Sequence, residues 1–153
     1  MTILLAFLIG FFAGLRALTP PALTAWAVSL GWLRLPRPLS LIGSKLSIMT
    51  LTLLGVVELV ADKLPRTPNR TAAPGLIARI ITGALTGACV VAGGAQGAVL
   101  GAMIGAVGGI VGCFGGYQAR TWLVKALGTL DIYIALLEDL VAVAGSLWVV
   151  SRF

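Results

Sequence analysis

The stretch GAVLGAMIGAVGGIVGCFGGY, residues Gly97–Tyr117, contains no charged residue and decides the class of fold. A helix needs about 20 consecutive apolar residues to cross the hydrocarbon core of a bilayer, and this stretch is long enough. Its glycines recur at intervals of four in two rows, so parts of the helix surface lack side chains and another helix can approach closely. We interpret the stretch as a transmembrane helix that packs against another helix of the chain or against a second copy. The packing glycines are Gly97, Gly101, Gly105, Gly109, Gly112 and Gly116.

The composition of the whole chain supports the same class. Of its 153 residues, 59% are hydrophobic and 10% are charged, whereas a soluble domain carries about 25% charged residues. A soluble fold of this size leaves too much surface exposed to hide so many apolar side chains. We therefore predict an all-α, polytopic transmembrane helical bundle that forms a single domain over residues 1–153.

The residue types exclude several functions. The chain has no histidine, so it cannot build a histidine-ligated haem, a histidine-containing zinc site or a Ser-His-Asp triad. Its two cysteines, Cys89 and Cys113, both fall inside apolar runs and are interpreted as small buried hydrophobes. We expect no metal site and no cofactor, and we expect that the protein is not an enzyme.

Basic residues outnumber acidic ones, 11 to 5. Most of them lie in short stretches between apolar runs, a placement that suits anionic lipid headgroups at a bilayer surface better than nucleic acid. Lysine and arginine are almost evenly divided between the two sides of the predicted bundle. The positive-inside rule therefore gives only a weak preference for an inside N-terminus, and an antiparallel homo-oligomer stays possible.

The apolar runs predict five full transmembrane helices, near residues 2–18, 39–60, 75–92, 97–117 and 130–150. Two further stretches, 22–33 after Pro20-Pro21 and 121–127 before Gly128, are too short to cross and are predicted to be re-entrant or interfacial helices. A six-span bundle is the alternative if residues 22–33 cross as a tilted helix. The polar, proline-rich segment 66–74 is the clearest loop, and Gly93–Gln96 is predicted to be a tight turn.

All five carboxylates lie in or beside the apolar runs, where each charge costs about 2.5–3.5 kcal/mol to bury in a bilayer. The first pair lies at the rim of the second span, and the later group extends about 12 Å into the last helix. Three interpretations are open: ion pairs that fix helix register, a site for a proton, cation or small substrate, or a water-lined vestibule. The carboxylates are Glu58, Asp62, Asp131, Glu138 and Asp139, and the charge partners are Arg16, Lys63, Arg79 and Arg120.

Several of these residues recur in a pattern that resembles a bacterial membrane family, the domain-of-unknown-function 4126 family. The resemblance rests on Gly14-Leu15-Arg16 with the following prolines, on the segment Glu58–Pro65, and on the late pair Glu138-Asp139. It covers nearly the whole chain. The name of the family states no activity, so the resemblance implies a compact bacterial membrane domain and nothing about a substrate.

The leading functional hypothesis is a small transporter or channel-like protein of the bacterial cytoplasmic membrane. Its carboxylates would bind a proton, a cation or the cationic part of a substrate, and its arginines would balance the charge. The rival hypothesis is a scaffold or accessory subunit, packed against a partner through its glycines. An intramembrane lipid-modifying enzyme ranks last, because the chain lacks histidine and shows no nucleophile constellation.

Overall fold

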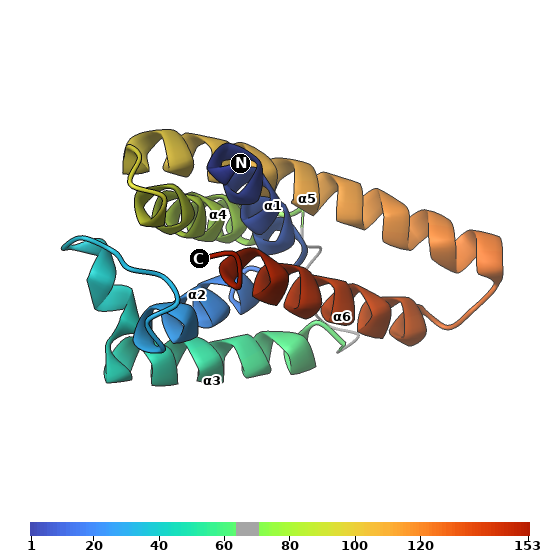
Figure 1. Ribbon diagram of the computed structural model, residues 1–153. Coiled ribbons are helices and arrows are strands. Elements are labelled where there is room, and N and C mark those ends of the chain that lie inside the picture. The colour runs from blue at the N-terminus through green and yellow to red at the C-terminus, as the bar shows by residue number, and fades with distance from the viewer. Residues whose placement is uncertain (64–70) are drawn as a thin grey trace.

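The computed structural model describes residues 1–63 and 71–153, and all regular elements in this part of the chain are helical (Figure 1). The helices α4, α5 and α6 are long, α1 and α2 are shorter, and a 3-10 helix, η1, precedes α3. This confirms the predicted all-α class. The elements are α1 (Thr2–Leu15), α2 (Thr19–Ser29), η1 (Leu39–Gly43), α3 (Lys45–Ala61), α4 (Ala73–Gly93), α5 (Ala98–Leu127) and α6 (Asp131–Val150).

The number of full spans is smaller than predicted. Among the described residues, α4, α5 and α6 are long and apolar enough to cross a membrane. The predicted full spans at 2–18 and 39–60 are not supported, because α1 has only 14 residues and α3 only 17. In the second of these runs, residues 39–43 form η1, and the Ser44 side chain caps α3 by accepting the Ser47 N–H at 3.2 Å. The loop predicted at 66–74 lies largely outside the described residues.

The short helix predicted at residues 22–33 is present but begins and ends earlier, at Thr19 and Ser29. Pro20 and Pro21 lie in its first turn, where a missing backbone N–H costs nothing because those groups have no partner within the helix. The prolines therefore start α2 instead of merely separating it from α1.

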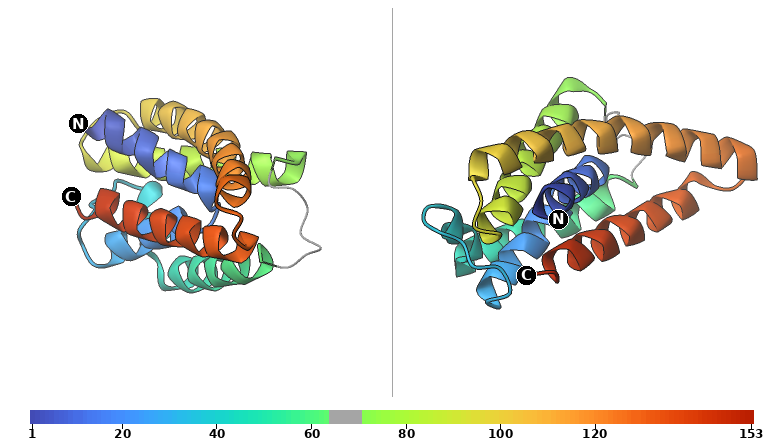
Figure 2. Two further views of the ribbon diagram at one scale, coloured as in Figure 1. Left: turned by 90° about the vertical axis from the view of Figure 1, so that its right-hand side faces the viewer. Right: turned by 45° about the horizontal axis from the view of Figure 1, so that its top comes forward.

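Helix α5 is one continuous element of 30 residues, so the predicted break between residues 117 and 121 is wrong. It is about 45 Å long and ends at Leu127, and the following residue Gly128 has a φ of 57°, which glycine readily adopts. The end of α5 and the start of α6 extend beyond the other helices (Figures 1 and 2). The predicted turn after α4 is confirmed, with Ala95 at a φ of 59°.

Glycines bring α1, α4 and α5 into backbone contact. A Cβ atom added to Gly105 would overlap the carbonyl oxygen of Gly83 on α4, and one added to Gly10 on α1 would overlap the carbonyl oxygen of Gly105. Gly101 and Gly109 on α5 face the α4 backbone in the same way, and Gly112 faces that of α1. Gly116 is buried, whereas a Cβ on Gly97 would meet open space. The glycine surface of α5 is thus largely covered within the chain.

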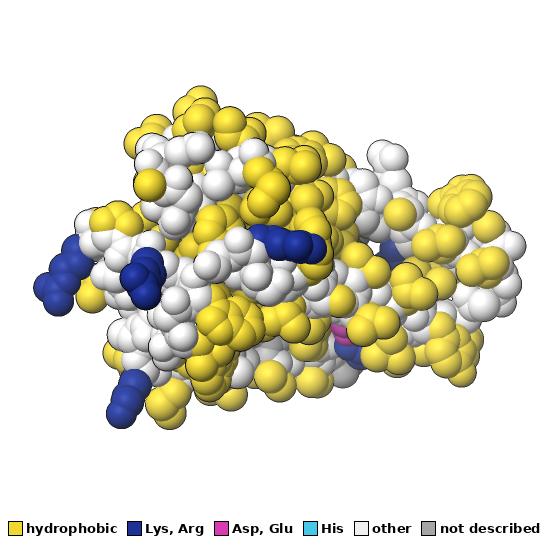
Figure 3. Space-filling model, viewed as in Figure 1, with side chains coloured by type: hydrophobic (Ala, Val, Ile, Leu, Met, Phe, Trp, Pro, Cys, Tyr) yellow, Lys and Arg dark blue, Asp and Glu magenta, His cyan; other side chains and the backbone are white. Residues whose placement is uncertain are grey.

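The outer surface is largely apolar. Figure 3 shows hydrophobic side chains over most of one face, with lysine and arginine prominent at one end and very little acidic surface. Residues such as Leu46 and Val99, 77% and 75% exposed, point away from the bundle. Such a surface suits contact with lipid chains, and the carboxylates are mostly inside.

Candidate functional site

The charged residues singled out in the sequence form two groups of ion pairs, one inside the bundle and one at the junction of α5 and α6, where the Asp131 side chain is 62% exposed. Among the described residues, all five carboxylates and four basic residues take part, and the pairs join α1 to α3 and α6, α3 to α4, and α5 to α6. We call this set the charge network. Its members are Arg16, Glu58, Asp62, Lys63, Arg79, Arg120, Asp131, Glu138 and Asp139.

Arg16 occupies the centre of the charge network and is fully buried. It is the C-cap of α1, where the backbone leaves the helix for an extended conformation (φ −137°, ψ 111°). Its guanidinium forms one ion pair with Asp62 and a second with Asp139, the latter at 2.5 Å between Nη2 and Oδ1. Arg16 therefore joins a carboxylate at the end of α3 to one in the middle of α6.

Lys63 and Arg79 each pair with a carboxylate of the network and also donate a hydrogen bond to a carbonyl at the end of a helix. Lys63 Nζ lies 2.5 Å from Asp139 Oδ2 and donates to the Leu59 carbonyl of α3 at 2.7 Å. Arg79 Nε donates to the Gly14 carbonyl at the end of α1, at 3.0 Å. Both cations thus satisfy carbonyls in the last turn of a helix, where the helix dipole favours positive charge.

Glu58 supports the corner between α1 and α2. Its carboxylate accepts the backbone N–H groups of Ala17 and Leu18 at 2.7 and 2.8 Å, and Arg79 Nη2 lies 3.9 Å from Oε1. These N–H groups belong to the break between the two helices and have no helical carbonyl to bond. Glu58 therefore fixes the direction in which the chain turns beside Arg16.

Replacement of Glu58 by alanine should destabilise the protein by about 1–3 kcal/mol for each backbone donor left buried without an acceptor. Glu58→Gln keeps a carbonyl oxygen while losing the charge, so we expect a smaller loss. Thermal unfolding in a mild detergent, followed by circular dichroism, measures both. Equal stability of the alanine and glutamine variants would contradict the role of these hydrogen bonds.

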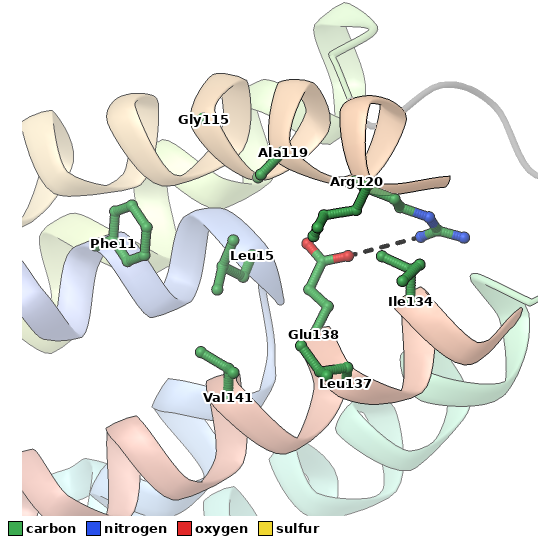
Figure 4. Close-up of a pocket in the computed structure, with 11 residues that line it drawn as sticks. Phe11, Leu15, Gly115, Ala119, Arg120, Ile134, Leu137, Glu138 and Val141 are labelled. Atoms are coloured by element: carbon green, nitrogen blue, oxygen red, sulfur yellow. Dashed lines mark ion pairs between the residues drawn. The ribbon is translucent and has the colours of Figure 1, made fainter. Parts of the chain in front are cut away.

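A second part of the network lies between α5 and α6. Arg120 Nε and Nη2 bind the two Asp131 oxygens at 2.8 and 2.5 Å, and Arg120 Nη1 lies 3.7 Å from Glu138 Oε2. Glu138 and Arg120 line a cavity of about 190 Å³ between α1, α5 and α6. Figure 4 shows Glu138 reaching from α6 toward α5, beside Leu15 and Ile134.

The structure changes the predicted grouping of the carboxylates. The predicted rim pair and deep group are joined in the structure, because Asp62 from the first and Asp139 from the second share Arg16. The adjacent residues Glu138 and Asp139 have different partners, with Arg120 beside Glu138 and Arg16 and Lys63 beside Asp139. The predicted packing glycines lie on α5, apart from Gly97 just before it, and form no part of the network.

Two buried polar residues outside the network were not predicted from the sequence. Thr19 and Ser146 are buried, and their hydroxyl oxygens have no hydrogen-bond partner. Ser146 follows Asp139 by seven residues and so shares its face of α6, which is the signal that could have found it. The lack of a hydrogen-bond partner for its hydroxyl is unusual in these helices, where five threonines donate to the carbonyl four residues earlier. These are Thr24, Thr50, Thr82, Thr86 and Thr121.

The centre of the network also has incomplete hydrogen bonding. Arg16 Nε has no partner. Arg16 Nη2 and Asp139 Oδ1 are close but are not aligned as a hydrogen bond. Buried polar groups of this kind are usually satisfied by internal water. Within the described residues, no group of three or more acids and cysteines has a spacing that could hold a metal ion.

The fold and the charge network define a class, namely small helical proteins with transmembrane-length helices and an interior ion-pair cluster. The family described as "Domain of unknown function (DUF4126)" matches residues 3–151, and the chain belongs to this family. This confirms the resemblance found in the sequence. No curated protein and no solved structure matches the chain.

Proposed function

We propose that the protein is a small transporter of the bacterial cytoplasmic membrane and moves protons or small cations through its charge network. The observation that carries this proposal is Arg16, a fully buried arginine held between two carboxylates of different helices. Ionisable groups inside a membrane protein are expensive to bury and commonly mark an ion or proton path. The proposal includes no catalysed reaction.

Two carboxylates hold the Arg16 guanidinium at the same time, through different nitrogens. Protonation of Asp139 at either oxygen removes one of the charges that hold the guanidinium, which then keeps only Asp62. Lys63 also loses its carboxylate partner while keeping its bond to the Leu59 carbonyl. Because these residues end α1 and α3, a proton on Asp139 weakens the connection of α6 to both helices. This is a means to couple proton binding to helix movement.

The unsatisfied polar atoms support a hydrated interior. Arg16 Nε, Thr19 Oγ1 and Ser146 Oγ are buried and can each bind water. Asp139 and Ser146 lie about 10 Å apart along one face of α6. Beyond Ser146, Val149 and Val150 belong to the apolar core, together with Val90 and Leu33. We infer that water reaches along α6 as far as this apolar layer, which would separate the network from the opposite side.

The rival scaffold hypothesis receives less support. It relied on the glycines of α5 as a surface for a partner, but α1 and α4 of the same chain cover most of them. The exposed apolar surface is explained by lipid contact, and the exposed basic residues Arg34, Arg37 and Lys45 suit anionic headgroups.

Proton flux in proteoliposomes tests the proposal. With a potassium gradient and valinomycin, the wild-type protein should acidify or alkalinise the lumen faster than empty vesicles, as measured with a trapped pH-sensitive dye. Asp139→Asn should lose most of this flux, because the amide keeps the size of the side chain but cannot take up and release a proton as a carboxylate does. The exposed residue Tyr133 on the same helix provides the control Tyr133→Phe, which should conduct normally.

Two results would count against the proposal. Wild-type vesicles with no more flux than empty ones would contradict transport of protons. Unchanged flux in Asp139→Asn, with a normal size-exclusion profile, would remove Asp139 from the path.

A further inference from the structure

An open groove lies between α3, η1 and α4. Its volume is about 510 Å³, within the roughly 300–1,000 Å³ of ligand pockets. Two hydroxyl groups line it, but both are already used. Ser47 donates to the Leu41 carbonyl at 3.0 Å, and Thr50 donates to the Leu46 carbonyl at 2.8 Å. The groove therefore presents an apolar surface that suits an alkyl chain, and its main walls are Leu39, Leu41, Ile42, Leu46, Leu51 and Leu85.

Basic residues adjoin this groove where α3 begins. Arg37 directly precedes Pro38, and Lys45 directly precedes Leu46, so both are next to residues that line the groove. Arg34 lies in the same connection between α2 and η1, and the side chains of all three cations are exposed. Figures 1 and 3 show basic side chains gathered at the end of the molecule where η1 and α3 begin.

No carboxylate neutralises these cations within the described residues. All five carboxylates form their ion pairs in the charge network instead. Glu58, the first acid on α3, follows Lys45 by 13 residues, or about 20 Å along the helix. The Ser44 cap accepts the N–H of Ser47, and the N–H groups of Lys45 and Leu46 have no acceptor within the helix. The positive end of the α3 dipole thus adds to the cations, and the entrance of the groove attracts an anion.

The surroundings of the groove favour a lipid over a soluble anion. Leu41 and Leu46 are exposed on an apolar surface that suits contact with lipid chains. Trp32, two residues before Arg34, is also exposed, and tryptophan is enriched at the interface between membrane and water. An acyl chain can therefore enter sideways from the bilayer while its headgroup stays at the level of the cations.

We propose that this groove binds one anionic phospholipid. Its phosphate lies against Arg37 and Lys45, which form charge-assisted hydrogen bonds to phosphate oxygens. One acyl chain lies along Leu46, Leu51 and Leu85. The proposal does not depend on the proposed transport function, so either can fail without the other.

The bound lipid adds packing to a helix that has little of its own. Within α3, only Ile48 and Gly55 are buried. Leu85 belongs to α4, so an acyl chain in the groove packs against both helices. Because α3 carries Glu58 and Asp62, the lipid also stabilises the position of two carboxylates of the charge network.

Native mass spectrometry of the protein, purified in a neutral detergent, tests the binding. The probes are phosphatidylglycerol and phosphatidylcholine with identical acyl chains, each added alone at the same concentrations. We expect the first phosphatidylglycerol molecule to bind roughly five- to twenty-fivefold more tightly than phosphatidylcholine, because each lysine or arginine near a membrane surface favours anionic lipid by about fivefold.

A charge variant locates the headgroup. The double variant Arg37→Gln, Lys45→Gln should lose most of the preference for phosphatidylglycerol. It should keep the affinity for phosphatidylcholine, which shows that the groove is intact. The matched control is Lys125→Gln, which removes one charge from an exposed lysine near the end of α5 and should keep the full preference.

A second pair of variants locates the acyl chain. Thr50→Phe places a ring in the groove and should remove the tightly bound phosphatidylglycerol. It should fold normally, because Thr50 is exposed and its hydroxyl bonds only to its own helix. Met49→Phe is the control on the same helix, since Met49 is exposed and does not line the groove, and it should bind the lipid as the wild type does.

Several results would overturn the proposal. Equal affinity of the wild type for the two lipids would make the groove a general contact for lipid chains. A preference that survives in the double variant, or that Lys125→Gln also loses, would assign it to charge spread over the surface. Tight binding by Thr50→Phe would place the lipid elsewhere. Lipid binding without proton flux refutes the transport function alone, whereas flux without preferred binding of phosphatidylglycerol refutes this inference alone.

Discussion

Arg16→Met should destabilise the folded protein by about 3–5 kcal/mol, the usual loss when one partner of a buried ion pair is removed. The change leaves Asp62 and Asp139 inside the protein without the guanidinium that lies against both. Lys63 still contacts Asp139, but Arg79 is 4.0 Å from Asp62 and offers only weak compensation. Unfolding in mixed detergent micelles with increasing dodecyl sulfate, followed by helical circular dichroism, gives the free energy of unfolding.

Further variants separate charge from packing. Arg16→Lys should recover only part of the loss, because an ammonium cannot bind two carboxylates through a planar fork. The triple variant Arg16→Met, Asp62→Asn, Asp139→Asn should be more stable than Arg16→Met alone, since the two carboxylates that faced the guanidinium are then neutral. Arg37→Met is the matched control at an exposed arginine, and its stability should change by no more than about 0.5 kcal/mol. If Arg16→Met and Arg37→Met have the same stability, the proposed role of Arg16 is wrong.

The sequence was sufficient for the class of fold and for the members of the network. Long apolar runs predict transmembrane helices because backbone and side-chain burial in lipid both depend on local composition. This reasoning holds for α4, α5 and α6. The acids and their basic partners could be chosen for a similar reason, since an ionised group in an apolar run needs an opposite charge nearby. All nine chosen residues take part in the network.

The ends of the helices could not be predicted, because contacts distant in the sequence determine them. Helix α1 stops at Leu15, where Arg79 binds the Gly14 carbonyl and Glu58 binds the N–H groups just beyond. Conversely, α5 continues past its polar residues. The Thr121 hydroxyl donates a hydrogen bond to the Tyr117 carbonyl, and Arg120 forms an ion pair with Asp131 on α6. When the partner on α6 is not known, a charged residue such as Arg120 after Tyr117 indicates the end of a helix.

Which charged residues pair with each other within the network could not be predicted from the sequence either. Helical spacing places Glu58 on one face with Asp62 and Asp131 on one face with Glu138, but it does not indicate that Arg16 joins Asp62 to Asp139. That link depends on the turn between α1 and α2, which directs the C-cap side chain of α1 inward. That the Ser146 hydroxyl has no hydrogen-bond partner could not be predicted for a similar reason, since a serine in a helix ordinarily bonds to its own backbone.

Gly105→Leu should disrupt the contact of three helices and produce the largest loss of folded protein among glycine variants of α5. Gly105 is packed against Gly83 and Gly87 of α4, and its own carbonyl faces Gly10 of α1. Even the single methyl group of Gly105→Ala would overlap backbone atoms, which cannot move aside as a flexible side chain can. Overpacking of an interior typically costs about 1–3 kcal/mol, and we expect alanine near the upper end and leucine beyond it.

Gly115 on the same helix is the matched control, because a Cβ there meets nothing within 4 Å. Gly115→Ala should leave stability unchanged or raise it by up to about 1 kcal/mol, since alanine favours the helix over glycine. Yield of monodisperse protein after detergent extraction, together with thermal unfolding, compares the two positions. Equal tolerance would mean that α1, α4 and α5 can separate at little cost, and then the glycines would not hold the helices that position Arg16 and Arg79. A difference confined to Gly105 ties the rigid glycine contact to the network, because α1 ends in Arg16 and α4 carries Arg79.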